Sequence, residues 1–264
     1  MDIVNAPQIG IVVPTLGTRP DFLNQALSSI RAAGECHIVI VAPDPEKIRM
    51  NYSEKLFDSV IEDPSSGLPQ AINTGMRSMP ASIKYANWLG DDDLLTPGSL
   101  NVASHTLDNS PSSVCVYGQC SYIGPTGNLL WINKSGNYAK WLMRIGPQLI
   151  PQPGSLFTLS AFTEAGGLNP NYKWAFDLDL FLKLSRIGSL QFISETLSSF
   201  RWHDGSLSVG GRRGSVYEAS KIRQEYLPKA LRGLSPMWEF FVRRLILGAG
   251  VVLSKRSRKK KELK

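Results

Sequence analysis

The chain has 264 residues, of which 42% are hydrophobic and 19% are charged, so it suits one large α/β domain and excludes global disorder. The net charge of +7 would suit a nucleic-acid partner, but residues 255–264 hold seven basic residues and one acidic residue, which is 7 − 1 = +6. The rest of the chain carries +1, so a nucleic-acid-binding protein is a weak interpretation.

The first half of the chain predicts alternating strands and helices. Apolar runs predict strands at residues 9–13, 38–41, 60–61 and 85–89. Helical spacing predicts one helix that is capped by Thr18 and stopped by Gly34, and a second helix from Gly67 to Met79. This order predicts a largely parallel sheet with helices on both faces.

The second half is more mixed and is expected to lie over the carboxyl edge of that sheet. Strands are predicted at residues 114–117, 129–132, 190–193 and 197–202, and a helix at 177–187. We therefore divide the chain into one domain at residues 1–235, with halves at 1–110 and 111–235, and a C-terminal tail at 236–264.

Features of a secreted or membrane-spanning protein are not expected. The N-terminus lacks the basic and apolar regions of a secretion signal, and the late apolar run Leu245–Leu253 is too short for a membrane span of about 20 residues. The three cysteines are odd in number and include no Cys-x-x-Cys pair. These observations favour a reducing cytoplasm.

Polar residues follow several of the predicted strands. Pro14 and Thr15, Asp44, Asp63 and the run Asp91–Asp93 all come directly after apolar segments, so they are expected to line one sheet edge. Three adjacent carboxylates repel one another, and their burial without a cation would be costly. The run therefore predicts a Mg²⁺ or Mn²⁺ site bridged to diphosphate oxygens. A solvated acidic loop before the next helix is the alternative.

Four stretches in this order resemble the inverting family 2 glycosyltransferases of the GT-A fold. They are Ile11–Thr15, Gly67–Gly75, Leu89–Asp93 and Trp174–Leu184. The second resembles the family pattern Gly-Ile-x-Asp-Ala-x-Asn-x-Gly, and the third resembles its Asp-x-Asp stretch. The resemblance spans residues 9–205 and implies a Rossmann-like, mostly parallel GT-A sheet, with the nucleotide-sugar on the first half and the acceptor on the second.

The resemblance assigns donor contacts to residues of the first three stretches. Pro14, Thr15 and Asp44 are expected to contact the nucleoside, with Asp44 accepting a hydrogen bond from the base. Asn73, in the second stretch, is expected to contribute to donor binding. Gln70 stands where the family commonly has Asp.

The same resemblance assigns the metal to the acidic run. Asp92 is the expected ligand, with Asp91 and Asp93 near the ribose, the metal or the sugar. His203 either completes the metal shell or contacts the diphosphate, and a polar loop residue is the equally weighted alternative. Gly90 occupies the place of the first Asp of Asp-x-Asp.

Asp177 is the predicted general base, because inversion requires a carboxylate that takes the proton of the attacking acceptor hydroxyl. The alternative is an acidic residue that only favours the N-terminal end of its helix. Asp179 is the weaker candidate. Trp88, Trp131, Trp141 and Trp174 are candidates for stacking on sugar rings, although a core role is the leading interpretation for each.

The predicted function is transfer of one sugar, from a UDP-linked donor most often in this family, to an acceptor hydroxyl during the synthesis of surface polysaccharide or glycolipid. Ser198 stands where processive synthases have the Gln of Gln-x-x-Arg-Trp, which favours one sugar per encounter. A nucleotidyltransferase is an alternative, but it would normally carry a basic, Gly-rich loop after the first strand. A non-catalytic nucleotide-sugar or nucleic-acid binding protein is another.

The tail predicts contact with a membrane surface. Trp238, Phe241, Leu245 and Val252 lie broadly along one helical face, and a run of Lys and Arg follows. We expect a peripheral protein on anionic lipid at the inner face of the cell membrane, which suits a glycan or lipid-linked acceptor. Packing of this helix on the domain, with a solvated basic end, is the alternative.

Overall fold

The structure is a computed structural model that describes residues 7–203, 205–206 and 211–262, and the side chains of these residues except 212 and 253–262. The basic run at 255–264, on which the expected attraction to anionic lipid partly depends, therefore lies outside the described side chains.

The first half forms the parallel part of a sheet, as predicted. The strands are β1 (Ile9–Pro14), β2 (His37–Ala42), β3 (Ser59–Glu62) and β4 (Tyr85–Trp88). They lie in the order β3-β2-β1-β4, and neighbours pair in parallel. Between and after them come α1 (Pro20–Ala33), α2 (Pro45–Asn51), a 3₁₀ turn (Glu54–Leu56), α3 (Leu68–Arg77) and α4 (Ser99–Asp108).

The second half continues the same sheet, which corrects the expectation that it lies over the sheet edge. Its strands are β5 (Leu94–Leu95), β6 (Ser113–Ile123), β7 (Leu129–Asn133), β8 (Ser155–Thr158) and β9 (Ser189–Arg201). β8 joins β4 to β6 by antiparallel pairing on both sides, and β6 then pairs in parallel with β9. The described sheet has nine strands, ordered β3-β2-β1-β4-β8-β6-β9-β5 with β7 beside β6.

The helices of the second half are α5 (Ala139–Leu142), α6 (Leu159–Glu164), α7 (Phe176–Ile187), α9 (Arg212–Tyr226), α10 (Lys229–Arg232) and α11 (Ser235–Glu262). The two strands predicted at 190–193 and 197–202 are one strand, β9. Its register with β6 shifts near Gln119, and this irregularity explains why the apolar pattern is interrupted at Ser194–Thr196.

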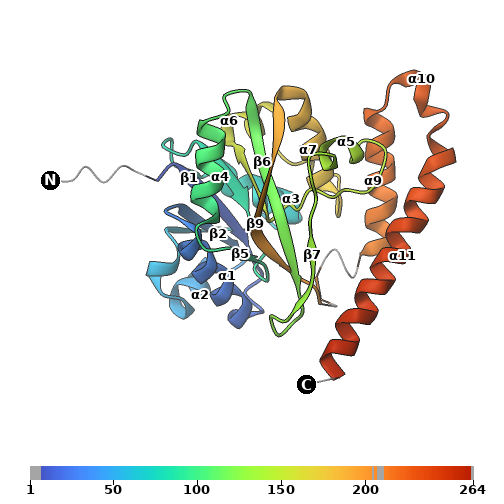
Figure 1. Ribbon diagram of the computed structural model, residues 1–264. Coiled ribbons are helices and arrows are strands. Elements are labelled where there is room, and N and C mark those ends of the chain that lie inside the picture. Colours follow the sequence, from blue (N-terminus) through green and yellow to red (C-terminus); the bar gives the residue numbers. More distant parts are fainter. Residues whose placement is uncertain (1–6, 204, 207–210, 263–264) are drawn as a thin grey trace.

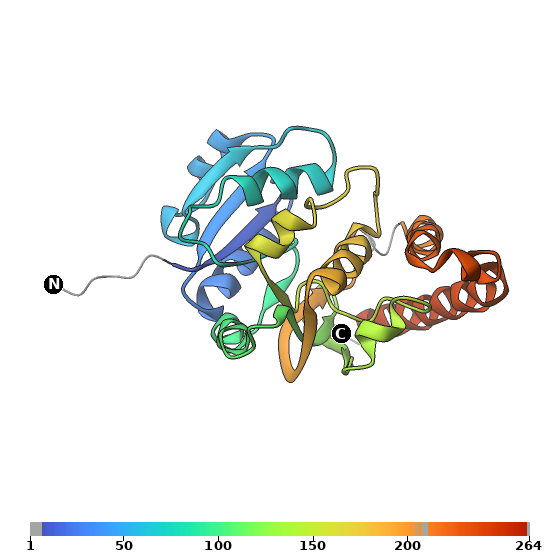
Figure 2. The ribbon, with the colours of Figure 1, turned by 90° about the horizontal axis from the view of Figure 1, so that it is seen from above.

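Helices cover both faces of the sheet and enclose two apolar cores (Figures 1 and 2). Alternating residues of β1 separate the two: Ile11 and Val13 pack against α1 and α4, whereas Val12 packs against α3. α3 lies so close to β1 that a Cβ on Gly75 would be 2.5 Å from Val12 Cγ1. This packing fixes the carboxyl ends of β1 and β4.

The start of α1 differs from the prediction. Its N-cap residue is Arg19 rather than Thr18, and no side chain caps it. Pro20 and Asp21 occupy the first turn, as expected, and Pro needs no hydrogen-bond partner there. The side chain of Arg19 is therefore free to reach the carboxyl end of β4.

The C-terminal helix α11 packs lengthwise against α9 and also contacts strand β7 (Figures 1 and 2). A bidentate ion pair joins them: Arg223 Nε and Nη2 donate to the two oxygens of Glu239 at 2.6 and 2.7 Å, and both side chains are buried. Trp238 is half-buried, whereas Phe241, Leu245 and Val252 of the predicted apolar face are exposed. No helix in the described part of the chain is long and apolar enough to cross a membrane.

Candidate functional site

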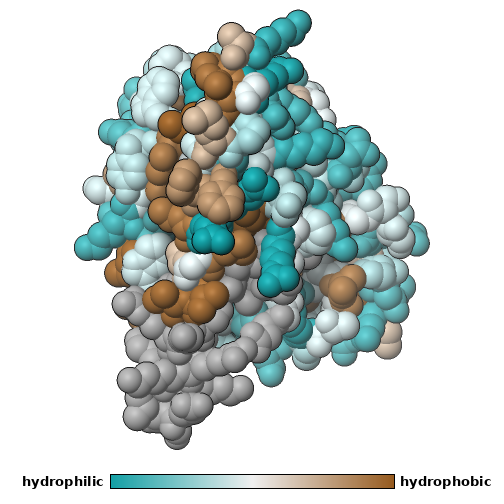
Figure 3. Space-filling model, turned by 90° about the vertical axis from the view of Figure 1, so that its right-hand side faces the viewer, coloured by the Kyte–Doolittle hydropathy of each residue, from teal (hydrophilic) through white to brown (hydrophobic). Residues whose placement is uncertain are grey.

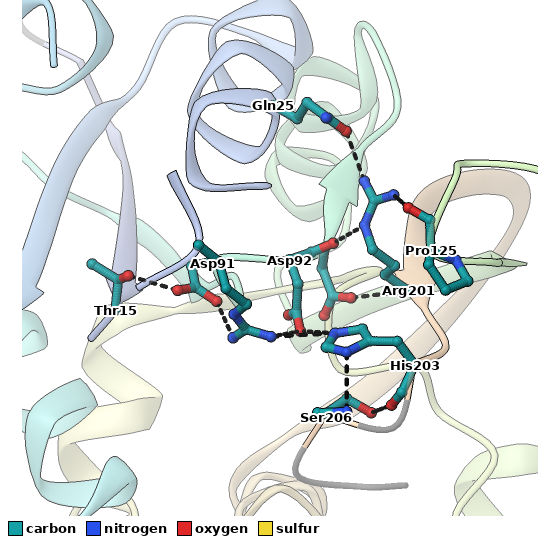
Figure 4. A network of polar contacts seen from close by, with 11 residues as sticks. Thr15, Gln25, Asp91, Asp92, Pro125, Arg201, His203 and Ser206 are labelled. Atoms are coloured by element: carbon teal, nitrogen blue, oxygen red, sulfur yellow. Dashed lines mark hydrogen bonds and ion pairs between the residues drawn. The ribbon is translucent and has the colours of Figure 1, made fainter. Parts of the chain in front are cut away.

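Side chains from the ends of β1 and β4 meet at the sheet edge (Figure 4). Thr15 Oγ1 donates to Asp91 Oδ2 at 2.6 Å, and the backbone N–H of Thr15 donates to Val41 in β2. Asp91, Asp92 and Asp93 follow β4 and are all buried. The prediction that these polar residues gather at one edge is confirmed for Thr15 and the acidic run.

The guanidinium of Arg19 lies on this acidic cluster, which we define as Asp91, Asp92 and Asp93. Its Nη2 donates to Asp91 Oδ1, and its Nη1 donates to Asp92 Oδ2 at 2.7 Å. One cation therefore bridges two of the three carboxylates. About a third of the Arg19 side chain, 35%, is exposed to solvent.

His203 completes the contacts of Asp92. Its Nε2 lies 2.7 Å from Asp92 Oδ2 and 3.2 Å from Arg19 Nη1 (Figure 4). The backbone N–H of Gly205 donates to His203 Nδ1, at 3.2 Å, so the ring hydrogen of the neutral form lies on Nε2 and points to Asp92. His203 is thus a donor in this arrangement, and it would need the other tautomer to bind a metal through Nε2.

Arg201 supports the cluster from β9. Its backbone N–H donates to Asp93 Oδ1 at 2.9 Å, and its Nε donates to the carbonyl of Asp92 at 2.8 Å. The rest of the guanidinium donates to Pro125 O and Gln25 Oε1 (Figure 4). It also covers the ring of Phe22 at 4.4 Å. This side chain is buried, so it acts as a fixed positive charge behind the carboxylates.

Burial dominates the ionisation of the cluster. It raises the pKa of Asp91, against the hydrogen bond from Thr15 and the charge of Arg19. Burial together with the charge of Asp92 raises the pKa of Asp93 well above its usual value. Burial thus outweighs the positive charges of Arg19 at Asp91 and of Arg201 at Asp93.

Gly90 leaves the space in front of the cluster open. A Cβ at this position would lie 2.9 Å from Asp92 Oδ1 and 3.3 Å from Asp93 Oδ2. An Asp side chain at this position would lie against the carboxylates of Asp92 and Asp93 and would repel them. Glycine in place of the first Asp of Asp-x-Asp therefore avoids this repulsion.

The donor chemistry of the cluster fits a hard divalent cation, but its closed arrangement does not yet form a metal site. Carboxylate oxygens are the preferred ligands of Mg²⁺ and Mn²⁺. Within the described residues, however, no group of three or more His, Cys, Asp or Glu side chains is set to hold a metal ion. Arg19 fills the position between Asp91 and Asp92 that a cation would need.

Three other predicted donor contacts have structural partners. Asp44 is exposed and caps α2 by accepting from the backbone of Lys47 at 3.0 Å. The Asn73 amide is buried and bonds both the N–H and the carbonyl of Leu168, at 2.9 and 2.8 Å. Pro14, at the end of β1, is half-buried. Contacts of these residues with a nucleotide stay predictions.

Asp177 lies in the first turn of α7, as predicted, and is half-buried. Burial raises the pKa of its carboxyl to about 6, against the hydrogen bond that the backbone N–H of Leu178 donates to Asp177 Oδ1 at 2.8 Å, which favours the ionised form. The charge of Glu218 adds a smaller rise. The carboxyl is therefore poised near neutrality.

The side chain of Asp179 is paired within the interior. Its Oδ1 accepts from the Tyr226 hydroxyl at 2.9 Å, and its Oδ2 lies 2.8 Å from Lys183 Nζ. α9 also holds the start of α7, because Glu218 accepts the backbone N–H groups of residues 173, 174 and 175. These contacts give Asp179 a structural role and leave Asp177 as the free carboxylate of this turn.

A row of aromatic side chains crosses three neighbouring strands beside the two carboxylate regions. Trp131 in β7, Tyr122 in β6 and Phe200 in β9 are cross-strand partners, with ring centroids 5.0 and 5.3 Å from Tyr122. The charges of Asp93 and Asp177 both raise the pKa of Tyr122, after burial and Cys120. Tyr122 therefore lies within electrostatic range of both, and Trp131 is the exposed end of the row.

The other tryptophans named in the sequence divide between core and surface. Trp88 is buried in the sheet. Trp174 packs beneath Gly211 and Gly214 of the α9 turn, where a Cβ would be 2.0 and 2.5 Å away. Trp141 is exposed on α5. The core interpretation is thus confirmed for Trp88 but not for Trp131 or Trp141.

Sequence reasoning missed Arg19 and Arg201 as parts of the site. The available signal was position: Arg19 follows β1 and Arg201 is the last residue of β9.

Comparison with known proteins finds relatives that are similar in sequence to this chain. No protein-family model matches the chain. The chain is 26% identical to an uncharacterized glycosyltransferase of Rickettsia typhi over 214 residues, which are 75% of this chain and 65% of that protein. It is 24% identical to a chondroitin synthase of Pasteurella multocida over 62% of this chain and 17% of that one. The chain thus spans less than two thirds of the length of these relatives.

Solved structures agree on the fold. TarS of S. aureus, residues 1–349, matches 89% of this chain and 71% of that chain, with a TM-score of 0.59 and 13% identity. A mannosyltransferase of Pyrobaculum calidifontis, in complex with GDP-Man and Mn²⁺, matches 95% and 74%, with a TM-score of 0.63 and 12% identity. The predicted fold is confirmed: a mixed α/β, mostly parallel sheet of the GT-A type.

Proposed function

We propose that this chain is a metal-dependent inverting glycosyltransferase that moves one sugar from a nucleotide-sugar to an acceptor hydroxyl. The observation that carries the proposal is the presence of two different carboxylate regions, both of which act on the pKa of Tyr122. The acidic cluster is crowded with cationic partners, whereas Asp177 is isolated and has a pKa of about 6. The relatives that are glycosyltransferases support this reading.

The donor diphosphate would bind at the acidic cluster. Asp92 and Asp93 would hold a Mn²⁺ or Mg²⁺ ion, with Asp91 beside the ribose and His203 joining after it gives up its contact with Asp92. When bound, the ion neutralises charge that develops on the departing diphosphate. Thr15 and the buried Arg201 keep the carboxylates in place, since each donates to one of them or to its backbone.

Asp177 would act on the acceptor. Its carboxylate takes the proton of the acceptor hydroxyl while the hydroxyl oxygen bonds to the anomeric carbon of the donor sugar. The bond from that carbon to the diphosphate oxygen breaks, and the nucleoside diphosphate leaves with the electron pair. Attack from the opposite side inverts the anomeric configuration. A base with a pKa of about 6 is mostly ionised at neutral pH and still accepts a proton in the transition state.

The donor is proposed to be UDP-linked and the product a surface polysaccharide or glycolipid. The first choice follows the resemblance of the sequence motifs, and the second agrees with a chondroitin synthase among the relatives. One structural neighbour carries GDP-Man, so GDP-sugars belong in any test.

A nucleotide-release screen tests the proposal. Purified full-length protein is incubated with UDP-, GDP- and dTDP-sugars, with Mn²⁺, with Mg²⁺ or with EDTA. We expect release of one nucleoside diphosphate that requires a metal, and NMR of the product should show an inverted anomeric configuration. A retained configuration would contradict the role of Asp177, and release of pyrophosphate would indicate nucleotidyl transfer instead.

We also propose that α11 rests on an anionic membrane surface, at the inner face of the cell membrane. Leu234, Met237, Phe241, Leu245 and Val252 are exposed at helical spacing and form a continuous apolar strip (Figure 3). Arg244 is exposed on the same helix, and the sequence continues into the basic run at 255–264. Apolar insertion beside basic residues is the pattern of interfacial helices on anionic lipid.

Point variants test this better than removal of the tail. Truncation after Ser235 would remove Glu239 and leave Arg223 charged and unpaired in the interior, which typically costs about 3–5 kcal/mol. In the full-length chain, Phe241→Ser with Leu245→Ser should abolish co-sedimentation with phosphatidylglycerol vesicles.

Met50→Ser provides the matched control, because Met50 is an exposed apolar residue on α2. It should leave vesicle binding unchanged, and high salt should release the wild-type protein. Equal binding to neutral vesicles would contradict the proposal, as would a stable dimer in solution that is broken by the double variant.

A further inference from the structure

Arg19 occupies the place of a metal ion in the acidic cluster. It contacts Asp91 and Asp92 through separate nitrogens, so its planar guanidinium spans the two carboxylates. The same nitrogen that reaches Asp92 lies 3.2 Å from His203. Every side chain assigned to the metal, apart from Asp93, is therefore in contact with Arg19.

Arg19 and a divalent cation cannot occupy the cluster together. Three carboxylates face two guanidiniums, those of Arg19 and the buried Arg201. Adding a divalent cation would place two cationic groups on the same oxygens of Asp91 and Asp92, where low dielectric strengthens their repulsion. If Arg19 leaves, Asp91 and Asp92 lose the cation that they share, and their oxygens become available to an ion.

Arg19 is placed so that it can leave. It comes from the loop between β1 and α1, where Leu16 and Thr18 are exposed, and 35% of its side chain is exposed. Among the described residues its guanidinium contacts Asp91, Asp92 and His203, whereas the guanidinium of Arg201 is buried and is also tied to Gln25 and Pro125. Arg19 is therefore a movable charge, and Arg201 is a fixed one.

We propose that Arg19 is a built-in counter-cation that exchanges with the metal and then binds the donor diphosphate. In the protein alone it neutralises Asp91 and Asp92 and opposes metal binding. When a diphosphate arrives with the ion, the guanidinium moves to the phosphate oxygens, which it can bind through two parallel hydrogen bonds. Metal and nucleotide therefore bind cooperatively, because each relieves the cost of displacing Arg19. This inference rests on the proposed metal-dependent function.

Mn²⁺ binding to the full-length protein tests the exchange without any turnover. Free Mn²⁺ is measured by electron paramagnetic resonance, with Mn²⁺ alone and then with UDP or GDP. Arg19→Gln should bind Mn²⁺ alone about tenfold tighter than the wild type, within the usual 5–150-fold range of coupling between sites. Nucleotide should tighten Mn²⁺ binding strongly in the wild type and much less in Arg19→Gln.

Arg31→Gln is the matched control. Arg31 lies at the opposite end of the same helix and also pairs with a carboxylate, Asp58, at 2.9 Å. The change removes the same charge, so a general electrostatic effect on Mn²⁺ would appear in both variants. Thermal melts supply a second readout: Mn²⁺ alone should raise the melting temperature of Arg19→Gln more than that of the wild type.

The outcomes separate this inference from the function on which it rests. If Arg19→Gln binds Mn²⁺ alone no tighter than the wild type and Arg31→Gln, the exchange is overturned, while metal-dependent transfer stands. If neither protein binds Mn²⁺ with or without UDP or GDP, the metal-dependent function itself is wrong, and the exchange falls with it.

Discussion

The acidic cluster and Asp177 are both withdrawn from solvent, but they differ in what balances their charge. Asp91 and Asp92 are bridged by Arg19, and Asp93 accepts from the backbone of Arg201. Asp177 accepts from the backbone of Leu178, and the charge of another acid, Glu218, helps burial to raise its pKa.

This difference separates two chemical roles. Carboxylates surrounded by cationic groups are suited to hold charge in place, which is what binding a diphosphate and its metal requires. A carboxylate that is desolvated without a cation has a pKa shifted toward neutrality, which is what proton transfer requires. Removing charge from the acidic cluster should therefore affect donor binding, and removing the charge of Asp177 should affect the chemical step.

The largest expected effect comes from Asp92→Ala. Asp92 contacts Arg19 and His203, so its loss removes the shared oxygen of the cluster. Transfer should fall by about 10³-fold or more, because charge on the leaving group is no longer stabilised. Calorimetry should show sharply weaker binding of the nucleoside diphosphate, with an unchanged circular dichroism spectrum. Activity that survives both this change and EDTA would contradict the metal-dependent mechanism.

Asp177→Asn should lower turnover by about 10²–10⁴-fold while donor affinity changes little. The amide keeps the size and hydrogen bonding of the side chain but cannot take a proton. Asp179→Asn is the matched control on the same helix: it disturbs Tyr226 and Lys183, and should change the melting temperature rather than the chemical step. If donor affinity fell as much as turnover in Asp177→Asn, the two regions would not have separate roles.

The sequence predicted the two carboxylate regions but not what balances them. Asp91–Asp93 directly follow an apolar strand, and Asp177 opens an apolar helix, so local pattern was enough to locate both. The partners of Asp91 and Asp92 are 72 and 73 residues away in Arg19, and those contacts depend on the parallel pairing of β1 with β4. No local pattern encodes such a distance.

The second half and the tail show the same limit. Periodicity found β6 and β9 in part but could not show that they extend the first sheet, because strand order is set by long-range pairing. On α11, apolar residues lie on more than one side. The buried pair of Arg223 and Glu239 decides which side faces α9, and that choice left Trp238 half-buried.

The pH dependence of kcat/KM should distinguish the role of Asp177 from that of the acidic cluster, with a change of about tenfold per pH unit. Since burial raises the pKa of Asp177 to about 6, kcat/KM should fall tenfold for each unit below pH 6 and level off above it. Asp177→Asn should lack this limb. A wild-type profile that is flat between pH 5 and 7 would show that no group with this pKa acts as the base.

The raised pKa of Asp177 also determines how the stability of the fold changes with pH. The folded-state pKa of about 6 lies above the ordinary Asp value of 3.8, so the neutral form is favoured in the fold. The stability that this carboxyl contributes is present below pH 4 and is lost as the pH rises through 6. Asp177→Asn should therefore be more stable than the wild type at pH 8, by about 1–3 kcal/mol, and equal to it near pH 4. Urea denaturation at both pH values measures the difference.

The smallest expected effect concerns the aromatic row between the two regions. Trp131 is 39% exposed and lies against Tyr122 with the two rings tilted, and the pKa of Tyr122 responds to both Asp93 and Asp177. An acceptor sugar that reaches Asp177 would pass this ring, and an aromatic contact of this kind contributes about 0.5–1.5 kcal/mol. Trp131→Ala should thus raise the acceptor KM by about 2–10-fold, with donor hydrolysis unchanged.

Trp141→Ala is the control for this change, since Trp141 is 61% exposed on α5 and its recorded ring contacts are with Lys140 and Arg144. It should leave the KM of a soluble acceptor at the wild-type value. Equal effects of the two variants would show that exposed indole surface in general, rather than the row beside Asp177, attracts the acceptor. A rise in donor KM with Trp131→Ala would instead place the row on the side of the acidic cluster, because the ring would then contact the nucleotide-sugar and not the attacking hydroxyl.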